Sequence, residues 1–278
     1  MREIASGVYL EKKYSGVQVA AIRGSGGLML VDCPLRVEDG REWLAQLAEF
    51  GRAKYLVLLD HHPDRVLGAR SLDVPCVAHD RTRVAIAAWP DTFKGSTRPI
   101  GGESDRLKRI TGVTKAVPQL SFSDETRIYL GERVVRLWHM PGPMAGASWL
   151  SISDSKVLFI GDSVTKSEPP YFGEANLEAW LEALDELRNP LYKGYRFVSA
   201  RDGFVDRQAI NAMARFLRRI PPAVNKLEAK GGSAEEAAKI GARLISSHRV
   251  TSARKEQVVQ RMKAGLIEQH SRLFRSGT

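Results

Sequence analysis

The chain has 278 residues, 43% hydrophobic and 27% charged, a composition typical of a folded globular protein and not of a disordered chain. Its 42 Lys and Arg against 32 Asp and Glu give a net charge of +10, but residues 206–278 alone hold 15 basic and 6 acidic residues. This excludes an evenly cationic protein, because a near-neutral body of 205 residues is followed by a basic segment.

The chain lacks the sequence signals of a membrane or secreted protein. No apolar run approaches the roughly 18 residues of a membrane span, and residues 1–13 lack the apolar core of a signal peptide. We therefore expect a cytoplasmic protein. Cys33 and Cys76 are the only cysteines, so the sequence predicts neither a disulfide framework nor a cysteine-rich zinc motif.

The first 200 residues alternate short apolar runs with amphipathic stretches, which is typical of an α/β protein. Strands are predicted over residues 7–10, 17–23, 28–31, 55–59, 74–78, 126–129, 134–138, 148–153, 157–160 and 197–199. Helices are predicted over residues 41–51, 81–89 and 176–187. The Gly- and Pro-rich segment 90–118 is expected to be a surface loop. From residue 206 onward the pattern is helical, with breaks at 221–222, 231–232 and near 247.

The most informative polar cluster directly follows the predicted strand 55–59. Asp60, His62 and Asp64 occupy alternate positions there, and Arg65 comes next. The carboxyl ends of strands are where α/β proteins build their sites. Oxygen and nitrogen ligands at this spacing can converge in a tight turn, so the cluster predicts a metal or catalytic site. The alternative is a solvated turn with a capping aspartate.

This pattern resembles the metal-binding motif of the metallo-β-lactamase superfamily, written His-x-His-x-Asp-His, which follows a strand in an αββα sandwich. Five further segments resemble family counterparts in the same order: 30–34, 74–79, 138–146, 157–162 and 198–203. The resemblance implies an α/β fold, an αββα metallo-β-lactamase-like sandwich over residues 1–205. A basic helical C-terminal extension follows over residues 206–278.

Position by position, most of the family's metal ligands are replaced. Taking Asp64 as the motif aspartate, the resemblance places Asp60, His62, Arg65, Pro143 and Asp202 at the five histidine positions. His62, Asp64 and Asp162 keep the family's residue. A carboxylate such as Asp60 can still bind Zn, Mn or Fe, but proline has no donor atom and a guanidinium offers only N–H groups.

Charge counting leaves two solutions for the site. If the fold gathers Asp60, Asp64, Asp162 and Asp202, four negative carboxylates surround the single positive charge of Arg65. They cannot all stay ionised there unless further positive charge balances them. One solution is a single divalent metal, Zn, Mn or Fe, on Asp60, His62, Asp162 and also Asp202, with Arg65 paired to Asp64 in place of a second metal. The other is no metal, with Arg65 bridging carboxylates and a protonated His62 or His139 beside it. We expect the first, without a second metal.

With one metal bound, the resemblance implies hydrolysis of an ester, thioester, lactone, amide or phosphoester in a small-molecule substrate. Asp64 would accept a proton from water, and Arg65 would hold an anionic group. The alternative is a non-catalytic relative that keeps the fold as a binding or scaffold module. Arg65 and Pro143 separate the two hypotheses, because each removes a ligand.

The basic segment 206–278 also allows two interpretations. Its apolar residues recur at helical spacing, which favours a docked helical cap with a basic solvated face. A nucleic-acid footprint is not favoured, because aromatic residues are sparse among its basic ones. Among the remaining histidines, His61 is expected to support the site or lie at the surface, and His79 and His139 are expected to be structural.

Overall fold

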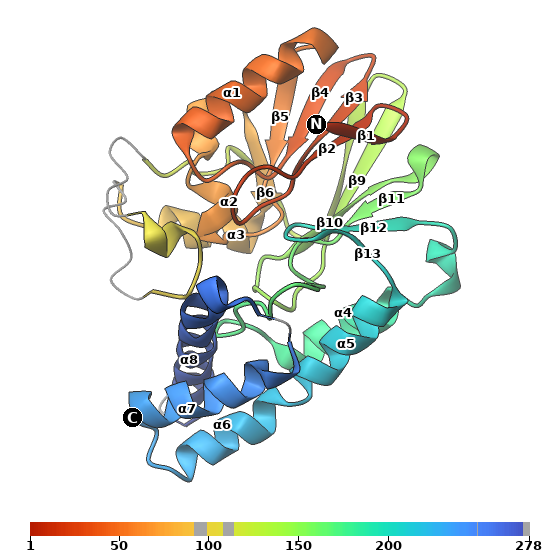
Figure 1. Cartoon of the computed structure of the whole chain (residues 1–278). Helices are drawn as coiled ribbons and strands as arrows, with labels where there is room; N and C mark the ends of the chain where they lie inside the picture. Colours follow the sequence, from red (N-terminus) through yellow and green to blue (C-terminus); the bar gives the residue numbers. More distant parts are fainter. Residues whose placement is uncertain (92–98, 108–113, 249, 275–278) are drawn as a thin grey trace.

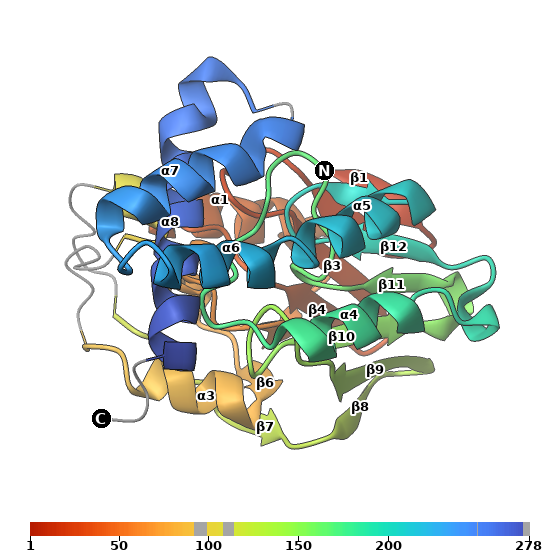
Figure 2. The ribbon, with the colours of Figure 1, turned by 90° about the horizontal axis from the view of Figure 1, so that it is seen from below.

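Two β-sheets lie face to face at the centre of the molecule, and helices cover their outer sides (Figures 1 and 2). The structure is a computed structural model that describes residues 1–91, 99–107, 114–248 and 250–274. Apolar side chains such as Val8, Ile22, Leu137 and Leu150 fill the space between the sheets. This interior holds the sheets together, because each buries one apolar face against the other.

The first sheet has seven strands in chain order. They are β1 (Arg2–Ala5), β2 (Val8–Glu11), β3 (Val19–Gly24), β4 (Gly27–Val31), β5 (Ala53–Val57), β6 (Cys76–His79) and β7 (Leu120–Phe122). Neighbours from β1 to β4 are antiparallel, and those from β4 to β7 are parallel. The carboxyl ends of the parallel strands therefore share one edge, where Asp60 and His62 follow β5.

The second sheet has six strands in the order β13-β12-β11-β10-β9-β8. They are β8 (Glu125–Leu130), β9 (Arg133–His139), β10 (Ser148–Ile152), β11 (Val157–Phe159), β12 (Arg196–Ser199) and β13 (Gly203–Val205). β11 and β12 are parallel. The turns after these two strands carry Asp162 and Arg201, so both residues leave the sheet at the same edge.

In the described part of the first half of the chain, the helices are α1 (Val37–Leu47), α2 (Pro63–Val66) and α3 (Asp80–Ala87). The second half has α4 (Leu177–Glu186), α5 (Arg207–Leu217), α6 (Ile220–Glu228), α7 (Ala234–Leu244) and α8 (Ser252–Phe274). α4 and α5 lie near the second sheet, and α6, α7 and α8 gather at one end of the molecule (Figure 1). Among the described residues, no helix combines the length and apolar character that a membrane crossing requires.

The C-terminal helices are docked onto the rest of the protein. One hydrophobic cluster joins Trp149 of the second sheet and Trp180 of α4 to residues of α5, α6, α7 and α8. This cluster includes residues on both sides of residue 205, where the sequence predicts a boundary. α7 and α8 approach closely where Gly241 faces Met262, since a Cβ atom on this glycine would lie 2.9 Å from the methionine Cβ.

Three strands have no counterpart in the sequence prediction. β1, β7 and β13 have only three or four residues each. β11 is equally short, but all three of its residues are apolar and buried, whereas β1 and β7 each bury a single residue and carry too weak an apolar pattern to reveal a strand. Part of the predicted loop 90–118 lies outside the described residues, and its described part contains a short 3₁₀ turn at Ser104–Arg106.

Gly265 allows a test of how α8 docks. A Cβ atom there would lie 2.9 Å from the ring of the fully buried Phe172. We expect Gly265→Leu to lower the free energy of unfolding by about 1–3 kcal/mol, because the larger side chain must displace the ring. Urea denaturation measures this loss. Ala253→Leu, at an exposed position of α8, is the control and should change stability by less than about 0.5 kcal/mol; equal losses would contradict the docking.

Candidate functional site

A strand, a tight turn and a short helix position the first four polar residues. After β5 the chain turns at Asp60, whose Oδ1 accepts a hydrogen bond from the backbone N–H of His62 at 2.8 Å. His62 is the N-cap of α2, and its Nδ1 accepts from the backbone N–H of Asp64 at 3.2 Å. Pro63 occupies the first turn of this helix, where its missing N–H is not needed. Asp64 and Arg65 are thereby turned into the protein.

Arg65 lies between two carboxylates and is fully buried. Its Nε and Nη2 donate to the two oxygens of Asp60, each at 2.8 Å, in a bidentate pair. On the other side Nη1 donates to Asp162 Oδ1 at 3.1 Å, and Nη2 lies 2.8 Å from Asp162 Oδ2. One guanidinium therefore joins the turn after β5 in the first sheet to the turn after β11 in the second.

Arg201 supplies a second cation from the turn after β12. Its Nε lies 3.1 Å from each oxygen of Asp162, and its Nη1 lies 3.5 Å from Asp64 Oδ2. Its Nη2 lies 2.9 Å from His62 Nε2. We call Asp60, His62, Asp64, Arg65, Asp162 and Arg201 the Arg–Asp network.

Sequence reasoning missed Arg201. The resemblance placed the neighbouring Asp202 at a ligand position, but the structure directs Asp202 elsewhere. Its carboxylate accepts from the backbone N–H of Lys166 at 2.7 Å, from that of Ser167 at 3.2 Å and from the Ser167 hydroxyl. The charge count contained the missing signal, because several carboxylates faced one assigned cation and Arg201 is adjacent in the sequence.

The network keeps its carboxylates ionised although they are buried. Burial alone would raise the pKa of Asp64, but His62, Arg201 and the backbone N–H groups of Glu103 and Ser104 outweigh it and lower that pKa to about 2. The pKa values of Asp60 and Asp162 are also lowered, because the adjacent guanidinium groups outweigh burial. These carboxylates therefore carry their charges at neutral pH.

Two further buried groups are neutral over part of the pH range: His62 is neutral above about pH 4, and Asp32 is neutral below about pH 7. Burial and the nearby Arg201 charge lower the pKa of His62 to about 4. Burial raises the pKa of Asp32 to about 7, although Arg65 opposes this rise. Asp32 has a left-handed backbone, with φ of 55°, and its Oδ1 accepts from the Leu59 N–H at 3.0 Å. The network thus contains a neutral imidazole beside two fixed cations.

The donor atoms of this site do not fit a resident metal ion. Both oxygens of Asp60 face Arg65, both oxygens of Asp162 face guanidinium nitrogens, and His62 Nε2 faces Arg201. Within the described ranges, no group of three or more His, Cys, Asp or Glu side chains is arranged to hold a metal. The two arginines therefore occupy the space between the ligands that the sequence suggested, namely Asp60, His62 and Asp162.

A loop and α8 close over the network. The segment 101–104 brings two backbone N–H groups to Asp64, and a Cβ atom on Gly102 would lie 2.8 Å from Asp64 Oδ1, so glycine permits this approach. From α8, Arg261 donates to the Gly101 carbonyl at 2.8 and 3.0 Å, and Gln257 donates to the Gly102 carbonyl at 2.8 Å. The side chain of Asp64, which this loop contacts, is 0% exposed.

The remaining histidines lie outside the network. His61 Nε2 is 2.8 Å from a carboxylate oxygen of Glu174. The rings of His79 and His139 stack with their centroids 3.9 Å apart, and their Nε2 atoms lie 2.7 and 2.8 Å from backbone carbonyl oxygens. These contacts agree with the structural role expected for His79 and His139.

Comparison with known proteins defines the class. The family model for the metallo-beta-lactamase superfamily matches residues 15–193. The chain therefore belongs to the metallo-β-lactamase superfamily, and its αββα fold with polar residues at the strand ends agrees with this membership. The sequence-based expectation of family and fold is confirmed. Membership suggests a metal-dependent hydrolase, and superfamily members usually bind divalent metals. No curated protein matches the chain.

Solved structures with the same fold are distant in sequence. A metallo-beta-lactamase from Pontibacter korlensis is 18% identical, with a TM-score of 0.62, over 78% of this chain and 97% of that chain. TMB-1 is 16% identical, with a TM-score of 0.61, over 78% and 96%. The DIM-1 metallo-beta-lactamase is 14% identical, with a TM-score of 0.61, over 78% and 95%. At these identities the likeness establishes the fold alone.

Removing Arg65 tests whether the network stabilises the fold. Arg65→Met leaves Asp60 and Asp162 buried with one cation fewer, so we expect the free energy of unfolding to fall by about 3–5 kcal/mol in urea denaturation. Arg127→Met removes the exposed ion pair with Glu125 and should cost less than about 1 kcal/mol. A loss at Arg65 as small as that of the control would show that the network does not support the fold.

The titrations of His62 and Asp32 predict opposite effects of pH on stability. Between pH 6.5 and 4 the unfolded His62 binds a proton that the folded one does not, so the free energy of unfolding falls by about 3 kcal/mol on acidification. Folded Asp32 instead keeps its proton from pH 7 down to about 4, where the unfolded carboxyl has lost it, so this group raises stability on acidification.

Two substitutions separate these contributions. Asp32→Asn removes the carboxyl that raises stability on acidification, and asparagine tolerates the left-handed backbone at this position. The free energy of unfolding of this variant should therefore fall more steeply from pH 7 to 4 than that of the native protein. His62→Gln should show the reverse, a stability that rises on acidification relative to the native protein. Urea denaturation at several pH values between 4 and 7.5 measures the slopes, and identical slopes in all three proteins would refute the assignment.

Proposed function

We propose that this chain is a superfamily member whose metal centre is replaced by the Arg–Asp network, and that it serves as a binding or scaffold module instead of a metal-dependent hydrolase. The observation that carries the proposal is the position of Arg65 and Arg201 among Asp60, His62 and Asp162. A guanidinium can neutralise these carboxylates, but it has no empty orbital for a water molecule and does not release a proton at neutral pH.

Burial supports the same proposal. A catalytic site must admit its substrate, yet the Asp60, His62, Asp64 and Arg65 side chains are each at most 2% exposed. Arg201, at 12%, is the most exposed side chain of the network. The contacts of α8 with residues 101–103 make this closure part of the folded core, since Arg261 itself is buried.

The second candidate is the single-metal hydrolase of esters, thioesters, lactones, amides or phosphoesters. It is favoured by family membership and by the adjacency of Asp60, His62 and Asp162, which Arg65 and Arg201 bridge. It requires Arg201 to leave the site so that a metal can reach His62 Nε2. Asp64 would then be the proton acceptor, and Arg65 would hold an anionic group of the substrate.

Metal uptake distinguishes the two candidates. We expect the native protein, dialysed against Zn²⁺ or Mn²⁺ and then against buffer, to retain far less than one equivalent, because its ligands are paired. The variant Arg65→Ala/Arg201→Ala frees Asp60, His62 and Asp162 and should retain about one equivalent, provided that circular dichroism shows it folded. Elemental analysis gives both values, and Arg127→Ala/Arg136→Ala is a control for the loss of two cations.

The opposite result would refute the proposal. If the native protein retains one equivalent of metal, if Asp162→Asn abolishes this binding and if the loaded protein hydrolyses a p-nitrophenyl ester, the single-metal hydrolase is correct. Native protein without metal and without esterase activity supports the metal-free module.

A further inference from the structure

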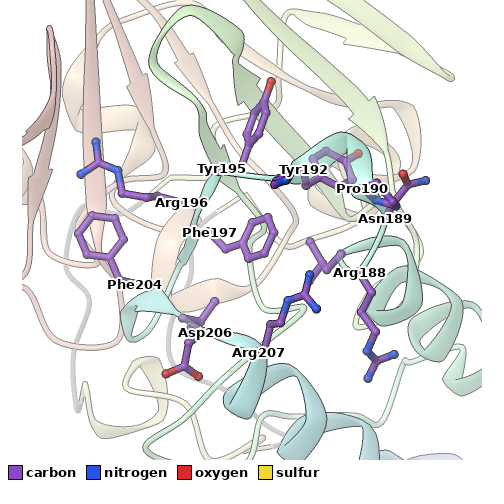
Figure 3. Close-up of a pocket in the computed structure, with 14 residues that line it drawn as sticks. Arg188, Asn189, Pro190, Tyr192, Tyr195, Arg196, Phe197, Phe204, Asp206 and Arg207 are labelled. Atoms are coloured by element: carbon purple, nitrogen blue, oxygen red, sulfur yellow. The ribbon is translucent and has the colours of Figure 1, made fainter.

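A cleft of about 660 Å³ lies between the start of β12, strand β13 and the first residue of α5 (Figure 3). It is separate from the Arg–Asp network. β12 runs from Arg196 to Ser199, with Arg196 at the cleft and Arg201 of the network beyond the other end of the strand. At about 3.3 Å per residue, the strand alone separates Arg196 from Ser199 by roughly 10 Å, and Arg201 lies in the turn beyond it.

Aromatic rings form the cleft's apolar surface. Tyr192, Tyr195, Phe197 and Phe204 line it, and all four side chains are half-buried. Tyr192 packs edge-on against Tyr195, with centroids 5.7 Å apart, and against Phe197, with centroids 6.3 Å apart. These contacts hold the rings in fixed orientations, so a flat ligand would meet a preformed surface at low entropic cost.

Cations surround these rings. Arg188, Lys193, Arg196 and Arg207 line the cleft, against the single carboxylate of Asp206. Asp206 caps α5 by accepting from the Ala209 N–H at 2.8 Å, and Arg188 pairs with Asp185. Lys193, Arg196 and Arg207 form no ion pair with any residue that the structure describes.

Two of these cations lie directly beside aromatic rings. The Arg196 guanidinium lies over the Phe204 ring, 5.6 Å from its centroid. In Figure 3 the Arg207 guanidinium points toward Phe197 in the middle of the cleft. A ligand that complements this surface must therefore carry a flat ring and a negative charge close together.

We propose that this cleft binds a nucleoside phosphate, with the base against the aromatic side chains and the phosphate at the Arg207 guanidinium in the middle of the cleft (Figure 3). A phosphomonoester carries nearly two negative charges at pH 7, which suits a cleft that four cations and a single carboxylate line. Aromatic rings stack on any base because every base has a π face. The volume of the cleft falls within the range of known small-molecule sites.

The ligand chemistry has two sources, a free nucleotide or a nucleotide within a single strand. Isothermal titration calorimetry with AMP and with a uridine hexanucleotide separates them. Binding of AMP at least as tight as that of the hexanucleotide identifies the free nucleotide, and at least tenfold tighter binding of the hexanucleotide identifies a strand. Either result supports the proposed chemistry, and absence of binding of both at millimolar concentration overturns it.

Two partial ligands test whether ring and charge are both needed. We expect adenosine and inorganic phosphate each to bind at least tenfold more weakly than AMP. We also expect AMP affinity to fall by tenfold or more between 20 and 200 mM salt. Phosphate that binds as tightly as AMP would overturn the role of the rings and leave only an anion site.

Matched substitutions locate the binding. Arg207→Glu and Lys193→Glu change exposed side chains of the cleft, and each should weaken AMP binding at least tenfold. The control Lys226→Glu, on the exposed face of α6, should change the affinity for AMP less than twofold. Tyr195→Ala should weaken AMP binding at least fivefold. Tyr129→Ala is its control, because Tyr129 is exposed on β8 away from the cleft. Equal effects of the cleft and control substitutions would overturn the assignment.

The inference rests on the proposed function only in taking binding as the role of the chain. Calorimetry of AMP does not depend on the Arg–Asp network, and it is to be repeated on protein treated with EDTA. Metal retention without AMP binding would refute both proposals. AMP binding that survives EDTA, in a protein that also retains metal before treatment, would refute the metal-free centre and leave the nucleotide site standing.

Discussion

The pairing of Arg65 and Arg201 with three buried aspartates is the constraint on which the rest of the structure depends. Asp60 and Asp64 follow a strand of the first sheet and Asp162 follows a strand of the second, so each sheet brings negative charge to the same interior point. Ionised carboxylates cannot be buried together without cations. Arg65 and Arg201 supply two positive charges, and Asp32 avoids a further negative charge at low pH because burial raises its pKa to about 7.

The same charge balance explains part of the basic C-terminal segment. Arg254 and Arg261 of α8 turn inward, and both contact the carboxylate of Glu168, while Arg254 also pairs with Glu103. Glu103 belongs to the loop whose N–H groups hold Asp64. Some cations of the segment are thus counter-ions for acids of the near-neutral body, and this is why α8 can seal the Arg–Asp network. The uneven charge of the sequence is partly cancelled in three dimensions.

The sequence was sufficient for the fold and for naming five of the six residues of the network, all but Arg201. Strand ends followed by polar residues, as at Asp60 and Asp162, are local signals, and the need of Arg65 for carboxylate partners follows from its charge. Whether Arg201 or Asp202 enters the network depends on how the turn after β12 is bent, because these adjacent side chains point in different directions. The sealing by α8 depends on contacts between residues about 160 positions apart, such as Arg261 and Gly101, for which no local pattern exists.

Exchanging a metal for guanidinium groups separates two properties that one metal ion combines. A divalent metal both neutralises carboxylates and lowers the pKa of bound water. Arginine keeps the first property, because its charge is permanent and its fork matches a carboxylate, and it lacks the second. A fold that needs charge neutralisation at its centre can therefore keep its stability after catalysis is lost. Under the proposed function, binding falls to accessible surfaces, and the aromatic and basic cleft beside β12 is such a surface, since its rings are half-buried and three of its cations form no ion pair with described residues.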